Sequence, residues 1–395
     1  MGEQPDTDEF PTDVVALAAR LVRIASENPP GNERPCAEYV VDWFTEHGVE
    51  AELVPTPGTD RPNAVATVGS GGPTLVLNGH TDVVPADDPG DWEHDPFGGE
   101  VDEGRLWGRG SADMKTGLAL AMVVARNRAA ELAGGEDLPG TLVVHAAAGE
   151  ETGLPGTRTL VDEGYGGDYA VVLEPTEFRV ATSAKGVVTY RVGVHGESTH
   201  ASNPDEGTNA IAQARALMDR IDEYDARLRE RSDPLVGKAY ANVTAFEAGT
   251  GSNMAVVPAR AEFLLDRRIL PEESIEDVDR EVDDLLAAAE RADGVVTDRE
   301  TVQHYGSAGI EPDHPLAELV RARTGDLAPA EPWGMAAATD AREFVADGVP
   351  AVVWGPGSLS EAHTVDESIP VADAERALPL LEGIVHDVLS GELEK

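Results

Sequence analysis

The sequence predicts an α/β protein in which a mixed, largely parallel sheet is interrupted by a smaller α+β domain. Short apolar runs alternate with stretches of helical period in the first half of the chain, a pattern typical of a parallel sheet layered with helices. From about residue 184 the order becomes β-α-β-β-α-β, which is the order of a ferredoxin-like unit. After about residue 306 the first pattern returns. We therefore expect one domain formed by residues 1–183 and 306–395, with a second domain, 184–305, inserted into it.

The elements of the larger domain follow from apolar spacing and turn residues. The spacing predicts a helix that begins near Thr12, which can cap it, and a second helix that buries Cys36. Gly-Ser-Gly-Gly at 69–72 is expected to form a hairpin turn. The other expected elements are strands at 63–69, 74–79, 142–148, 170–173 and 349–354, and helices at 115–132 and 372–389.

The inserted domain is predicted from the same signals. Its expected elements are strands at 187–195, 241–247, 260–269 and 295–304, and helices at 208–230 and 274–292.

Charge limits the classes of partner. Among 395 residues, 74 are acidic and 30 are basic, for a formal net charge of -44. Such a field repels nucleic acid and anionic membranes, so neither is expected as a partner. A hydrophobic content of 41% is too high for a disordered acidic chain. We therefore expect a folded protein with an acidic surface suited to high salt, where ions screen the self-repulsion.

Cysteine content and hydropathy bear on the compartment. Cys36 is the single cysteine, which excludes an intramolecular disulfide and a cysteine-based zinc site. The N-terminus lacks the basic and apolar regions of a signal peptide, and no apolar run approaches the length of a membrane span. We expect a cytoplasmic protein.

An imidazole is predicted at the end of a core strand. The run 74–79 reads as a buried strand that stops just before His80. Two residues on, Asp82 could accept a hydrogen bond from the second ring nitrogen, an arrangement that fixes the tautomer of a metal-binding histidine. Taken alone, this pattern fits an ordinary strand end with polar residues as well as it fits a metal-binding histidine.

Acidic or imidazole groups recur where other strands end or turns begin. In open α/β sheets such groups collect outside the carboxyl ends of the strands, so they could meet in space. Histidines and carboxylates without cysteine suit a divalent ion, Zn²⁺ first and Mn²⁺ or Co²⁺ next. The segments are His80 with Asp82, Gly108–Lys115, Ala148–Gly153, Leu173–Pro175 and Glu361–His363.

These motifs, in order from Pro29-Pro30-Gly31 to Ala362-His363, together resemble one family. The chain is similar to the di-zinc peptidase and deacylase superfamily of acetylornithine deacetylase, succinyl-diaminopimelate desuccinylase, aminoacylase-1 and the glutamate carboxypeptidases such as carboxypeptidase G. The resemblance implies a zinc-peptidase-like catalytic domain. It also implies that the inserted ferredoxin-like domain serves as a dimerisation or lid domain, and hence that the protein is a homodimer.

The resemblance also implies a metal centre with two zinc ions per chain, for which Co²⁺ or Mn²⁺ could substitute. His80 and Glu174 would be the terminal ligands of one ion, Glu151 and His363 those of the other, and Asp113 would bridge the two. Zinc lowers the pKa of bound water to near 7, so a hydroxide shared by the ions could attack an amide. The peptide bond after Asp113 would be cis. A helix N-cap is the simpler alternative for Asp113.

The expected catalytic residues are Glu150, Asp82 and His200. By the resemblance, Glu150 would be the general base and His200 would donate to the oxyanion in a neighbouring subunit's site. Glu151 could not replace Glu150, because neighbouring side chains point in different directions. The simpler alternatives are a solvated loop for the Glu-Glu pair and a surface histidine for His200.

Substrate contacts are implied for a further set of residues. Arg268 matches the arginine that holds a substrate carboxylate, a task that suits a guanidinium fork. Ala255 and Ala338 depart from the family pattern where Asn and Gly are frequent. A helix start and a loop are the simpler alternatives for the segments around 339 and 357. The other expected contacts are Asn253, Thr339, Arg342 and Gly357.

The expected activity is removal of an acyl group from an N-acyl amino acid, of the acetylornithine deacetylase or succinyl-diaminopimelate desuccinylase type. A dipeptidase or carboxypeptidase on the same scaffold is the alternative, since both reactions break an amide beside a free carboxylate. A non-catalytic binding homologue is the alternative of another class, although it would have no need of Glu150.

Overall fold

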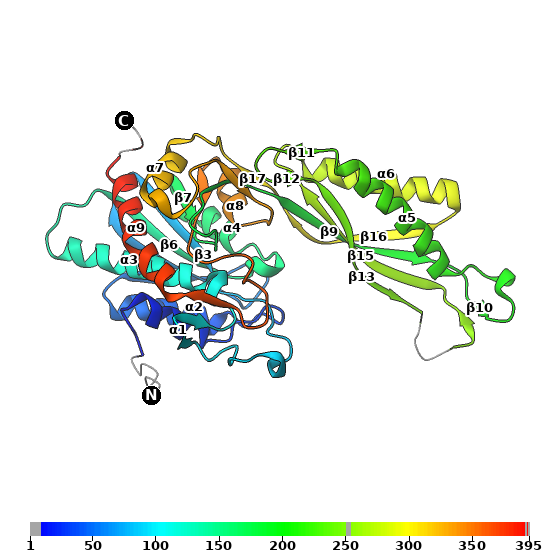
Figure 1. Cartoon of the computed structure of the whole chain (residues 1–395), viewed down its shortest axis with the longest axis horizontal. Helices are drawn as coiled ribbons and strands as arrows, with labels where there is room; N and C mark the ends of the chain where they lie inside the picture. Colours follow the sequence, from blue (N-terminus) through cyan, green and yellow to red (C-terminus); the bar gives the residue numbers. More distant parts are fainter. Residues whose placement is uncertain (1–8, 250–253, 392, 394–395) are drawn as a thin grey trace. The chain divides into compact units, whose positions relative to one another are not determined.

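The structure, a computed structural model, describes residues 9–249, 254–391 and 393. The chain forms two compact units, and the second is, in sequence, an insertion into the first (Figure 1). The first unit comprises Met1–Thr182, Gly309–Gly334 and Thr339–Lys395, and the second comprises Ser183–Ala308 and Met335–Ala338.

A mixed sheet with a parallel centre organises the first unit. In the described residues, its nine strands are β1 (Glu50–Val54), β2 (Asn63–Ser70), β3 (Thr74–His80), β6 (Gly140–Ala147), β7 (Tyr169–Val172), β8 (Ala181–Ala184), β17 (Ala308–Gly309), β18 (Trp333–Met335) and β19 (Ala351–Val353). Their order is β1-β2-β6-β3-β7-β19-β8-β17, and β18 pairs with β8. The neighbours β6, β3, β7 and β19 run parallel, whereas β1, β2 and β8 pair antiparallel. The predicted mixed sheet is thus confirmed.

Helices cover both faces of this sheet because alternate strand residues point to opposite sides. Leu75 and Leu77 of β3 belong to the large apolar core that includes α3 (Thr116–Ala133) and α9 (Val371–Leu389). Asn78 points the other way and donates to Thr157 of α4 (Gly156–Leu160). The helices of this unit are α1 (Val14–Val22), α2 (Arg34–Glu46), α3 (Thr116–Ala133), α4 (Gly156–Leu160), α7 (Pro315–Thr324), α8 (Ala341–Ala346) and α9 (Val371–Leu389). None of the helices described in either unit is long and apolar enough to cross a membrane.

Two local expectations in this unit were wrong. The first helix is capped by Asp13, whose carboxylate accepts the N–H groups of Val15 and Ala16, and not by Thr12. The turn at 69–72 does not close a hairpin, because β2 and β3 do not pair with each other. The strand β6 lies between them, antiparallel to β2 and parallel to β3.

A small antiparallel sheet joins two distant segments of the first unit. Its strands are β4 (Glu100–Asp102), β5 (Arg105–Trp107) and β20 (Ser368–Pro370), in the order β20-β5-β4. Ser368 is opposite Trp107 in this pairing. The segment that precedes α3 is thereby tied to the segment that precedes α9.

The second unit has the predicted ferredoxin-like arrangement. Its main strands and helices, as far as the structure describes them, are β9 (Gly186–His195), α5 (Ala210–Leu228), β13 (Tyr240–Ala248), β15 (Arg260–Ile269), α6 (Ile275–Asp293) and β16 (Val296–Tyr305). The strands are antiparallel in the order β13-β15-β9-β16. Asn209 and Ser274 cap the two helices, which pack on the sheet through a separate apolar core.

Candidate metal centre

Four of the five predicted metal ligands lie at or after the carboxyl ends of the four central parallel strands. His80 is the last residue of β3. Glu151 follows β6, Glu174 follows β7, and His363 follows β19. Parallel strands present their carboxyl ends at one edge of the sheet, so segments far apart in the sequence meet there.

Asp113 comes from a short helical segment, Ser111–Lys115, that leads into α3. The residue before the first turn of α3 is Lys115, so Asp113 does not cap that helix. The Asp113–Met114 peptide bond is cis, as the resemblance implied. Asp113 is buried, and its carboxylate faces the histidines.

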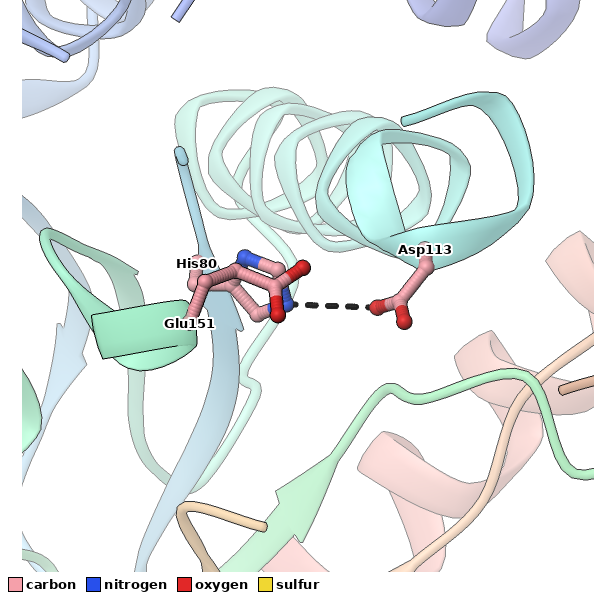
Figure 2. A group of neighbouring side chains, drawn as sticks. All are labelled: His80, Asp113 and Glu151. Carbon is pink, nitrogen blue, oxygen red and sulfur yellow. Dashed lines mark hydrogen bonds and ion pairs between the residues drawn. The ribbon is translucent and has the colours of Figure 1, made fainter. Parts of the chain in front are cut away.

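The buried imidazole of His80 forms the first half of the centre. Its Nδ1 donates to the carbonyl oxygen of Asp82 at 2.9 Å, and because a carbonyl only accepts, Nδ1 must carry the proton. Nε2 therefore faces the carboxylates, 3.3 Å from Oδ1 of Asp113 and 3.8 Å from Oε1 of Glu174. Figure 2 shows His80, Asp113 and Glu151 converging, and one ligand atom from each lies within 4.8 Å of the others.

The half-exposed imidazole of His363 forms the second half. Its Nε2 lies 3.1 Å from Oε1 of Glu151 and 3.5 Å from Oδ2 of Asp113. The two oxygens of Asp113 thus face two different imidazoles. This is the placement that a carboxylate shared by two cations requires.

The donor set fits a pair of divalent cations. Two ligands that each lie about 2.0 to 2.1 Å from a tetrahedral zinc ion are about 3.3 Å apart. The separations between imidazole nitrogen and carboxylate oxygen here run from 3.1 to 3.8 Å. Imidazole and carboxylate donors suit Zn²⁺, Co²⁺ and Mn²⁺.

The pKa values reflect a crowded, water-poor cluster. Burial raises the pKa of Glu151, and burial together with the charge of Asp113 raises that of Glu174 well above its usual range. Hydrogen bonds to Asp113 and Glu151 raise the pKa of His363 to about 10. Burial opposes protonation of His80, but Asp113 and other carboxylates nonetheless raise its pKa well above 6.5. Buried like charges demand compensating positive charge, which protons or metal ions can supply.

We predicted that the carboxylate of Asp82 accepts the hydrogen bond from the ring of His80, and this prediction was wrong. Its Oδ1 lies 3.5 Å from Nδ1 of His80, farther than the Asp82 carbonyl oxygen that takes the bond. The carboxylate instead accepts the side-chain N–H of Asn28 at 2.9 Å. It also accepts the backbone N–H groups of Gly149, Glu150 and Glu151 at 3.0 to 3.1 Å. Asp82 therefore holds the turn that carries the Glu-Glu pair.

Glu150 and Glu151 point to different partners. Whereas Glu151 faces His363, Oε1 of Glu150 lies 3.5 Å from Nη1 of Arg342. Burial, and next the charge of Asp340, raise the pKa of Glu150 to about 8. The buried guanidinium of Arg342 also pairs with Asp340 at 3.1 Å. The structure therefore gives Arg342 a contact with Glu150 that the sequence did not predict, and its substrate contact stays a prediction.

Thr339 and Gly357 have local structural tasks. The buried Thr339 accepts the N–H of Ala341 at 3.4 Å, where α8 begins. Gly357 has a φ of 82°, and a Cβ there would lie 2.9 Å from the side chain of Ile369. Their substrate contacts stay predictions.

The remaining predicted site residues belong to the second unit. His200 is exposed, and its Nδ1 accepts the N–H of Ser202 at 3.1 Å, which leaves the ring proton of a neutral imidazole on Nε2. Arg268 on β15 pairs with Asp266 at 2.8 Å. Asn253 lies outside the described residues. The roles of all three stay predictions.

A polar network that was not predicted from the sequence holds the centre. The Oδ2 of Asp340 accepts a hydrogen bond from Thr157 at 2.6 Å, and Thr157 accepts one from Asn78 at 2.8 Å. This connects Arg342 to β3, two residues before His80. Asn28 and Glu367 were also missed, since each acts through a partner that is distant in sequence.

Fold and site together define a metal-dependent hydrolase with an inserted α+β domain. The family model described as Peptidase family M20/M25/M40 matches residues 76–387, and the chain belongs to this family. The chain is 31% identical to acetylornithine deacetylase of Shigella sonnei over 353 residues. These aligned residues cover 88% of this chain and 89% of that protein.

Solved structures share the fold. A metallo-carboxypeptidase of the M20 family from Sulfolobus solfataricus superimposes with a TM-score of 0.79 at 19% identity, over 96% of this chain and 99% of that chain. Human carnosine dipeptidase 1 superimposes with a TM-score of 0.75 at 16% identity, over 95% and 96% of the two chains.

Proposed function

We propose that this hydrolase removes the acyl group from an N-acyl amino acid, with two divalent cations, zinc first, held in the candidate centre. The observation that carries the proposal is the placement of Asp113, one oxygen toward His80 and the other toward His363. The similarity to acetylornithine deacetylase supports an N-acetyl amino acid as substrate.

The residues would divide the work as follows. When bound, the two cations supply positive charge that polarises the carbonyl and lowers the pKa of the attacking water. Glu150 would take a proton from that water and deliver it to the leaving amine, and burial, which raises its pKa to about 8, favours its holding that proton between the two steps. Arg342 would hold the Glu150 carboxylate in place. Asp82 would fix the turn from which Glu150 and Glu151 project.

The second unit would complete the reaction. Nε2 of His200 would donate to the developing oxyanion in a partner's site, and Arg268 would bind the substrate carboxylate. These roles require a homodimer. The acidic composition supports work at high salt.

A peptidase is the second candidate, because the solved structures that share the fold include a carboxypeptidase and a dipeptidase. The test is a panel of N-acetyl amino acids, N-succinyl amino acids and dipeptides, assayed in high salt with Zn²⁺ or Co²⁺. We expect the acetyl substrates to have the highest kcat/KM. Preference for dipeptides would favour the second candidate, and no turnover on any amide would contradict both.

A further inference from the structure

Glu367 is a buried carboxylate that bonds the backbone of a candidate metal ligand. Its side chain has no exposed surface, and its Oε1 accepts the N–H groups of Ala112 at 3.0 Å and Asp113 at 3.1 Å. A buried carboxylate is costly unless it is paired and hydrogen-bonded. These bonds therefore fix the backbone from which the shared carboxylate of Asp113 projects.

The other oxygen of Glu367 pairs with Arg109, which is also buried. Nη1 of Arg109 lies 2.7 Å from Oε2 of Glu367 and also donates to the carbonyl oxygen of Thr364 at 3.1 Å. Thr364 directly follows His363. The guanidinium thus binds the carboxylate that holds Asp113 and the segment that carries His363.

Backbone bonds join the same two segments. The N–H of Gly108 donates to the carbonyl oxygen of Glu367 at 2.9 Å, and Ser368 of β20 pairs with Trp107 of β5. The ion pair therefore lies between two segments, 107–113 and 363–368, that backbone hydrogen bonds already join. The Glu367 side chain extends this connection to the backbone of Asp113.

We propose that the Glu367–Arg109 ion pair sets the spacing between Asp113 and His363, and thereby the affinity for the cation that these residues hold with Glu151. The inference rests on the proposed two-cation centre. In the described part of the chain, no hydrogen bond or ion pair joins this pair to His80 or Glu174. The other cation is therefore less dependent on it.

Glu367→Gln is the informative substitution, because it changes the hydrogen-bonding chemistry but hardly the shape. A carboxylate accepts on both sides, whereas an amide must turn its NH₂ either toward the two backbone N–H groups or toward the guanidinium. One of the two contacts then becomes donor against donor. Glu367→Asp is the companion variant, since it keeps the charge but withdraws the oxygens by one methylene.

Asp366→Asn is the matched control. Asp366 neighbours Glu367 in the same loop, but its carboxylate accepts the N–H groups of Glu93 at 2.8 Å and His94 at 3.3 Å. Its backbone φ of 57° lies in a region that asparagine tolerates. The control disturbs the loop without touching the Asp113 backbone.

The test is calorimetric titration of the metal-free full-length proteins with Zn²⁺ alone, together with their melting temperatures. We expect the parent and Asp366→Asn to bind two ions. Glu367→Gln should bind the ion beside His363 and Glu151 10- to 100-fold more weakly, as for the loss of other groups that orient ligands. The ion beside His80 and Glu174 should weaken by less, because of its ligands only Asp113 is held by Glu367. If Glu367→Gln does not fold, Glu367→Asp decides by the same titration.

A purely structural ion pair would lower the melting temperature but leave the ratio of the two affinities unchanged. That result, or equal weakening of both ions, would overturn the inference while the two-cation centre stands. If the parent itself binds fewer than two ions, the proposed centre fails and the inference fails with it.

Discussion

Nε2 of His363 lies 3.1 Å from Oε1 of Glu151, although 212 positions separate these residues in the sequence. The contact exists because β6 and β19 are both parallel members of the same sheet and end at the same edge. The contact brings together the two terminal ligands of one predicted cation. Neither of them is a predicted ligand of the cation beside His80.

The two halves should be separable by mutation. His363→Ala removes a nitrogen donor from one half only, so we expect one ion to remain and one to be lost. Metal analysis by mass spectrometry after dialysis measures this. His94→Ala is the control, because His94 belongs to the same unit but stacks on Trp107, with ring centroids 4.3 Å apart. Loss of both ions in His363→Ala would contradict the two-half arrangement.

Glu150 should matter for turnover and not for metal binding. Glu150→Gln keeps the shape but cannot accept a proton, and loss of a general base lowers kcat by about 10² to 10⁴. We expect the variant to retain both ions. Glu343→Gln is the control, since Glu343 also pairs with Arg342, at 3.0 Å. A Glu150→Gln enzyme with near-parental kcat would rule out this residue as the base.

Arg342 offers a choice between two roles. If it orients Glu150, Arg342→Lys should lower kcat by about 10²-fold with little change in KM, because a small misplacement of a catalytic group is costly. If it binds substrate, as the sequence predicted, KM should rise while kcat changes little. Steady-state kinetics on the preferred substrate distinguishes the two outcomes.

The role of His200 across subunits can be tested by mixing inactive chains. His200→Ala should lower kcat by about 10² to 10³ and leave both ions bound, as for the loss of an oxyanion donor. When His200→Ala and Glu150→Gln chains exchange subunits, half of the dimers are mixed, and each has one complete site. Activity should recover to about a quarter of the parental value. No recovery would show that His200 does not serve a partner's site.

Because His145 is buried as a neutral imidazole, we expect the folded protein to lose stability in mild acid. It lies buried in β6, and burial lowers its pKa from 6.5 to about 3. The unfolded chain therefore binds a proton here between these values and the folded chain does not, so stability is lost as the pH falls below 6.5. From pH 6.5 to 5, the metal-free parent should lose about 2 kcal/mol more unfolding free energy than His145→Gln. Urea titrations at both pH values measure this, and parallel losses would contradict it.

From the sequence it was possible to predict those site residues that directly follow a strand. His80 and the Glu-Glu pair follow apolar runs directly, so their placement at one sheet edge follows from the parallel order. Glu367 and Asn28 could not be found in this way. Their carboxylate and amide act on groups that are far away in the sequence, and no local pattern marks such a contact.

The fold errors have the same origin. Glycines at 69–72 signal a turn, but they do not tell whether a third strand will enter between the two that they connect, as β6 does here. Thr12 and Asp13 are both good helix caps, and the choice depends on where the first buried residue of α1 falls.

The central claim is that two cations share Asp113. Anomalous diffraction from crystals grown with Zn²⁺ tests it most directly. We expect two peaks about 3.5 to 4 Å apart, one beside His80 and Glu174 and the other beside Glu151 and His363. A single peak, or none among these five side chains, would contradict the account.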